Sequence, residues 1–101
     1  MRHAQKIAIA RLISDLIKSD DIICQEEIAL YNQIVSNFEI IDSELYEAQS
    51  ISLSDAVSTI QHMTSDDKRK LYSILHQAAY SDNSCVAREA LLLLTLPLTL
   101  D

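Results

Sequence analysis

The sequence contains no glycine and a single proline, Pro97. Average proteins contain about 7% glycine and about 5% proline, and tight β-hairpins depend on glycine for their positive φ angles. The absence of glycine therefore predicts helices joined by turns in which Asp, Asn and Ser adopt the unusual backbone angles. It also excludes glycine-rich phosphate loops and the nucleophile elbow of α/β-hydrolases. We expect a protein that is not an enzyme.

Basic residues are also scarce, with 8 Lys and Arg against 15 Asp and Glu, and the formal net charge is −7. Affinity for nucleic acid comes mainly from Lys and Arg contacts to phosphates, so nucleic acid is not an expected partner. A negative surface favours cations or a basic protein surface instead. The longest apolar run, from Ala90 to Leu94, is far shorter than the ~20 residues needed to cross a membrane. Direct membrane insertion is therefore not expected.

Two cysteines, Cys24 and Cys85, are too few for a disulfide framework. No signal-peptide pattern is present, and reduced cysteines are typical of the cytoplasm, which is the expected location. A length of 101 residues corresponds to one domain, residues 1–101.

Apolar residues recur with helical spacing. A first stripe predicts an amphipathic helix that ends near Ser19; it consists of Ile9, Leu12, Ile13, Leu16 and Ile17. A second helix is predicted to begin near Cys24, with a core face of Ile28, Tyr31, Ile34, Val35 and Phe38. The fold class is therefore all-α, a compact bundle of about six helices.

Polar residues mark where the later helices begin. The predicted N-terminal caps are Asp42 or Ser43 for a short third helix, Ser52 with Asp55 in a capping-box pattern for the fourth, and Thr64 or Ser65 for the fifth. The buried face of the fifth helix is predicted to be Leu71, Ile74, Leu75, Ala78 and Ala79. The last helix is predicted from about Val86 to Leu96, and Pro97 ends it.

The chain contains an internal repeat at a shift of 62 residues, which brings the apolar stripe of the first helix onto that of the fifth. The same shift aligns the two turns that follow, Ser19-Asp20-Asp21 and Ser81-Asp82-Asn83, and it aligns Glu27 with Glu89. Both copies therefore carry an Asp followed seven residues later by a Glu. We interpret this as two helical hairpins related by a pseudo-twofold axis.

The repeated turn resembles the signature of the TerB-like family, helical domains associated with tellurite resistance and with the N-terminal part of DjlA-type co-chaperones. That signature, Lys-Ala-Asp-Gly-x-Ile-x-x-x-Glu, is similar to residues 18–27 and 80–89 here, except that Asp21 and Asn83 replace its glycine. Asp and Asn tolerate the left-handed conformation best after glycine. The resemblance covers residues 7–96. The chain is short for the family, so we expect either a trimmed chain or a domain cut from a longer protein.

The resemblance implies a non-catalytic bacterial stress-response module that binds a protein partner. It also implies a divalent-cation site, Ca²⁺ or Mg²⁺, with the matching positions Asp20, Glu27, Asp82 and Glu89 as ligands and Asp21 and Asn83 as auxiliary ligands. Hard cations do take carboxylate oxygens. The same residues are also explained as turn and capping residues of the following helices. Both interpretations stay open at this stage.

A run of leucines near the C-terminus, within Leu91–Leu100, is apolar on nearly every side of a helix. Such a helix is usually buried in a core, although an exposed apolar face of this size marks an interface. The segment therefore belongs either to the core or to a homodimer contact.

Overall fold

The computed structural model describes residues 2–18, 25–81 and 85–95, and within them the chain is helical, with no strand. The elements are α1 (His3–Lys18), α2 (Gln25–Asn37), α3 (Asp42–Glu47), the single-turn 3₁₀ helix η1 (Ala48–Ser50), α4 (Leu53–Gln61), α5 (Ser65–Ser81) and α6 (Cys85–Thr95). The all-α architecture with about six helices is thus confirmed. The predicted ends of the first and last helices and the predicted start of the second agree with the structure to within one residue.

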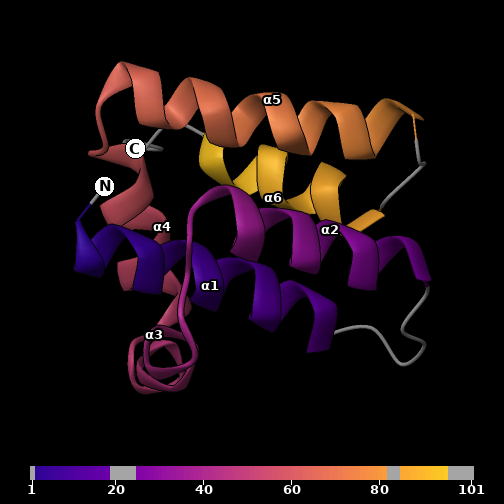
Figure 1. The fold of residues 1–101 in the computed structure, drawn as a ribbon. Coiled ribbons are helices and arrows are strands. Elements are labelled where there is room, and N and C mark those ends of the chain that lie inside the picture. The colour runs from indigo at the N-terminus through magenta and orange to yellow at the C-terminus, as the bar shows by residue number, and fades with distance from the viewer. Residues whose placement is uncertain (1, 19–24, 82–84, 96–101) are drawn as a thin grey trace.

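α1 lies at the centre of the fold and packs against α2, α3, η1, α4 and α6, most extensively against α4. The two predicted hairpins correspond to α1 with α2 and to α5 with α6. In Figure 1 each pair crosses the molecule and returns, so that α1 and α5 both end on the right of the view. α5 packs closely on α6, and α2 bridges the pairs by contacting α5. A twofold relation between the pairs stays a prediction.

The core lies between these helices, and its largest fully buried side chains are Ile9, Leu12, Ile13, Ile34, Ile60, Leu71, Leu75 and Val86. Full burial of one aliphatic side chain of this size contributes about 1.5–3 kcal/mol. All five residues of the predicted α5 stripe are buried, as are the first four of the α1 stripe, while Ile17 is half-buried. The helical spacing therefore identified the core faces of α1 and α5 correctly.

Two of the predicted caps are present. The Ser52 hydroxyl accepts the Asp55 N–H at 3.1 Å, and the Thr64 hydroxyl accepts the Asp67 N–H at 3.3 Å. The prediction for the third helix was wrong, because the N-cap of α3 is Ile41 and not Asp42 or Ser43.

The start of α3 is stabilised from inside the helix. The Glu44 carboxylate accepts the Ile41 N–H at 3.0 Å. This is the reciprocal half of a capping box. It uses only the backbone of the N-cap residue, so an apolar side chain is tolerated at that position.

The C-terminus of α2 has a left-handed residue without glycine. Glu39 has a φ angle of 53°, and it is the non-glycine residue with positive φ in the described part of the chain. The Ile40 N–H donates to the Val35 carbonyl at 3.0 Å and the Glu39 N–H to the Ser36 carbonyl at 3.3 Å. This is the Schellman pattern. From the sequence we expect Asp, Asn and Ser to adopt the unusual backbone angles of turns without glycine. In the described part of the chain the positive φ angle belongs to a glutamate.

Candidate functional site

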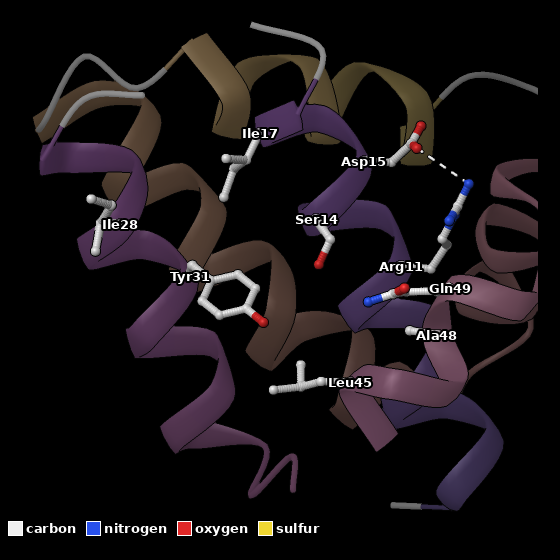
Figure 2. Close-up of a pocket in the computed structure, with 9 residues that line it drawn as sticks. All are labelled: Arg11, Ser14, Asp15, Ile17, Ile28, Tyr31, Leu45, Ala48 and Gln49. Atoms are coloured by element: carbon white, nitrogen blue, oxygen red, sulfur yellow. Dashed lines mark ion pairs between the residues drawn. The ribbon is translucent and has the colours of Figure 1, made fainter. Parts of the chain in front are cut away.

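A pocket of about 400 Å³ opens on the surface between α1, α2 and the α3–η1 segment (Figure 2). Its lining residues are Arg11, Ser14, Asp15, Ile17, Ile28, Tyr31, Leu45, Ala48 and Gln49. Pockets that hold small molecules or anchoring groups have volumes of roughly 300–1,000 Å³. The pocket is therefore large enough to receive a ligand group.

The apolar part of the pocket exists because α2 carries more apolar residues than the core covers. The core side of α2 is formed by Leu30, Ile34 and Phe38, and even Glu27 is buried there, with 6% of its surface exposed. The neighbouring Ile28, predicted as a core residue, is 50% exposed and lines the pocket together with Tyr31. The predicted α2 core face was therefore correct at Ile34 and Phe38, wrong at Ile28, and it omitted the buried Leu30.

Three neutral polar side chains face one another across the pocket. Figure 2 shows the hydroxyl of Ser14, the hydroxyl of Tyr31 and the side-chain amide of Gln49 pointing into the space between α1, α2 and η1. Within the described residues none of the three makes a side-chain hydrogen bond, so their donors and acceptors are open to a ligand.

The charged residues of the lining pair with each other. Arg11 Nη2 lies 3.3 Å from the Asp15 carboxylate, one helical turn along α1, and Figure 2 shows this pair at the side of the pocket away from Tyr31. An ion pair with this degree of exposure contributes little to stability. The described residues of the lining thus carry one positive and one negative charge, which offset each other. The pocket therefore favours an uncharged group.

The α3 wall of the pocket is attached to the N-terminus of α1 through His3. Its Nδ1 lies 2.7 Å from a Glu44 carboxylate oxygen, and its Nε2 lies 2.9 Å from a Glu47 carboxylate oxygen. Hydrogen bonds to Glu47 and Glu44 raise the pKa of His3 above its ordinary value. Burial acts to raise the pKa of Glu44, but the Ile41 N–H and His3 outweigh it and hold the pKa of that carboxyl below its ordinary value.

Only two of the predicted cation ligands, Glu27 and Glu89, belong to the residues that the structure describes. Asp20, Asp21, Asp82 and Asn83 lie outside the described residues. Glu27 is buried, whereas Glu89 is exposed, so the two glutamates that the repeat equates have different surroundings. Among the described residues there is no group of three or more His, Cys, Asp or Glu side chains that could hold a metal ion. The divalent-cation site at the acidic turns stays a prediction.

The leucine run divides between core and surface. Leu91 and Leu94 are buried, whereas Leu92 is 61% exposed, and residues 96–100 lie outside the described part. Cys24 and the side chain of Cys85 are likewise outside it. The homodimer contact stays a prediction.

Sequence reasoning missed both the pocket and the contact of His3 with α3. The available signal for the pocket was the unusual width of the α2 apolar surface, which includes Leu30 in addition to the five residues of the predicted stripe. No local signal connects His3 with Glu44, which lies 41 residues further along the chain.

Comparison of the chain with protein-family models, curated proteins and solved structures finds no match. The resemblance to the TerB-like family therefore rests on the motif of residues 18–27 and 80–89. In the part of the chain that the structure describes, no helix has the length and apolar character required to cross a membrane.

Proposed function

We propose that this chain is a non-catalytic binding module whose pocket receives one aromatic side chain, Tyr or Trp, from a partner protein. The observation that carries this proposal is the combination of apolar walls with three unengaged neutral polar groups in one half-open pocket. The TerB-like resemblance of the acidic turns adds a bacterial stress-response setting to the proposal, and the two cysteines, too few for a disulfide framework, favour a cytoplasmic location.

The chemistry of the lining favours an aromatic residue with a polar tip. Ile17, Ile28 and Leu45 offer apolar surface to a ring. The hydroxyls of Ser14 and Tyr31 are placed to bond a phenol O–H or an indole N–H. Tyr and Trp combine a large apolar body with such a group, and they are enriched at protein interfaces for this reason. A few side chains of this kind, seated in pockets, supply most of the binding energy of many interfaces.

The pocket lining also supports binding over catalysis. Among the described residues that line it there are two hydroxyls but no His, Cys or Lys. The one carboxylate among these residues, that of Asp15, is paired with Arg11. A serine acts as a nucleophile when a base within hydrogen-bond reach takes its proton, and the Ser14 hydroxyl has no such contact among the described residues.

The proposal is tested by NMR titration with side-chain analogues. The neutral probes are p-cresol and indole, and the charged probes are n-butylamine and propionate. We expect the neutral probes to shift the resonances of Ser14, Tyr31 and Gln49 in a saturable manner, with dissociation constants on the order of millimolar. The charged probes should not produce this shift.

Gln49→Trp should fill the pocket and abolish the response to p-cresol. Gln77→Trp, on the exposed face of α5 and away from the pocket, is the matched control and should respond like the native chain. Saturable shifts that are centred elsewhere, or that survive in the Gln49 variant, would show that the pocket is not the binding site.

A further inference from the structure

His3 connects two elements that are distant in the sequence. It begins α1, and its two ring nitrogens contact two carboxylates of α3, those of Glu44 and Glu47. The two contacts differ in their surroundings, because the Glu44 side chain is 4% exposed whereas that of Glu47 is 53% exposed. Glu44 is also fixed by the Ile41 N–H, so it stays in place when the histidine changes.

These two carboxylates are adjacent to the pocket residues of the α3–η1 wall. Glu44 directly precedes Leu45, and Glu47 directly precedes Ala48 and Gln49. α3 has only 6 residues. A helix of that length is not stable by itself in water. The position of the wall therefore depends on its contacts with α1. His3 supplies two polar ones, at Glu44 next to Leu45 and at Glu47 next to Ala48.

The protonation state of the imidazole decides how many of these contacts are favourable. A charged imidazolium has two N–H donors, one for each carboxylate. A neutral imidazole has one N–H donor, and its other nitrogen presents a lone pair. Facing a carboxylate, that lone pair makes the second contact repulsive. When the imidazolium loses one proton, one of its two contacts stays attractive and the other becomes repulsive.

We propose that His3 is a pH-operated latch on the pocket, which fixes the α3–η1 wall when the imidazole is charged and releases it when the imidazole is neutral. This inference rests on the proposed binding function of the same pocket. Release moves the exposed Glu47 end of α3 first and loosens Leu45 and Ala48. A less ordered wall binds an aromatic side chain more weakly, because binding must then also order the wall.

The charged groups around His3 set the pH at which the latch releases. Glu47 and Glu44, both from α3, stabilise the imidazolium and raise the pKa of His3. Lys6, on α1, acts on the Glu44 carboxylate. Among the described residues, α2, α4, η1 and α6, which also pack against α1, contribute no group that shifts the pKa of His3. Release therefore occurs above the ordinary histidine pKa of about 6.5.

The latch is tested first without any ligand, by an NMR titration from about pH 5.5 to about pH 8.5, the range in which histidine changes charge. The methyl resonances of Leu45 and Ala48 should follow the same midpoint as the His3 ring protons. His3→Gln should remove this titration, and Glu47→Gln should lower its midpoint. His76→Gln, at an exposed histidine on α5, is the matched control and should leave it unchanged.

The second measurement is the affinity for indole, which does not ionise in this range. We expect the dissociation constant of the native chain to rise about threefold to tenfold between the two pH limits, and that of His3→Gln to stay constant. If Leu45 and Ala48 do not follow His3, or if they follow it while indole affinity stays constant, the latch is refuted and the binding function is not affected. If indole does not bind at any pH but the wall still follows His3, the binding function fails and the latch on the wall stands.

Discussion

Replacing Glu39 by glycine should stabilise this protein, although glycine usually weakens helical structure. Glu39 follows α2 with a φ angle of 53°, a left-handed conformation that an L-residue adopts at a cost of about 1–2 kcal/mol. Glycine does not incur that cost. It loses more conformational entropy on folding, which offsets about 0.5–1 kcal/mol. With the middle of each range, the net gain for Glu39→Gly is about 0.75 kcal/mol in the free energy of unfolding.

The contacts at this turn are preserved in the variant. The Lys6 ammonium donates to the backbone carbonyl of Glu39 at 3.3 Å, and the Ile40 N–H donates to the Val35 carbonyl. Both bonds use backbone acceptors that glycine retains. The Glu39 side chain itself is exposed, so its removal uncovers no core surface.

Urea unfolding and thermal unfolding measure the effect. For a domain of this size, 1 kcal/mol corresponds to about 4–8 °C in Tm, so Glu39→Gly should raise Tm by about 3–6 °C. Glu39→Ala removes the same charge but retains Cβ, and the difference between the two variants isolates the backbone term. Ser73→Gly, on the exposed face of α5, should instead lose about 0.5 kcal/mol. A Glu39→Gly protein no more stable than Glu39→Ala would refute the reasoning.

Further outcomes are expected at other positions. Leu75→Ala in the core should lose about 2–5 kcal/mol in urea unfolding, because Leu75 is fully buried. The stability contributed by the Glu44–His3 contact should be largest between their two pKa values: it is lost as pH falls through the lowered pKa of Glu44 and as pH rises through the raised pKa of His3. Glu44→Gln should remove the acidic flank of the pH–stability curve and reduce the alkaline flank, where Glu47 still contacts His3. A homodimer through the C-terminal leucines predicts that light scattering shows concentration-dependent mass, which Leu92→Glu removes. A cation site at the acidic turns predicts that Ca²⁺ or Mg²⁺ raises Tm and that Asp82→Ala abolishes this rise; the same rise in the variant would exclude Asp82 as a ligand.

The sequence predicted α1 and α5 well and α2 less well, for a physical reason. In α1 the first four residues of the predicted stripe are buried, and because this helix is central the core also covers Ile7, Ala8 and Ala10 on its other sides. In α2, Ile28 and Leu30 lie on different sides of the helix, and both are apolar. Which one enters the core depends on the shape of α1 and α5 beneath them. Leu30 is buried and Ile28 is half exposed. Helical spacing alone does not predict which of the two is buried.

The candidate site was less predictable because three separate elements build it. Ser14, Tyr31 and Gln49 come from α1, α2 and η1, and no short motif contains them. His3 likewise matched the pattern of an ordinary surface histidine until the fold placed α3 beside it. Spacing rules identify residues that share one helix face, whereas this pocket depends on how helices distant in the sequence approach each other.

The central position of α1 has a consequence for how the chain folds. Helical proteins usually fold fast because most of their contacts are local in sequence. Here the most extensive helix pairing joins α1 to α4, with α2, α3 and η1 between them in the chain. The α5–α6 pair can form locally, but the core closes only when the first helix meets the fourth. Folding speed is therefore set by a long-range encounter, and substitutions at Leu12 and Ile60 should slow folding more than they accelerate unfolding.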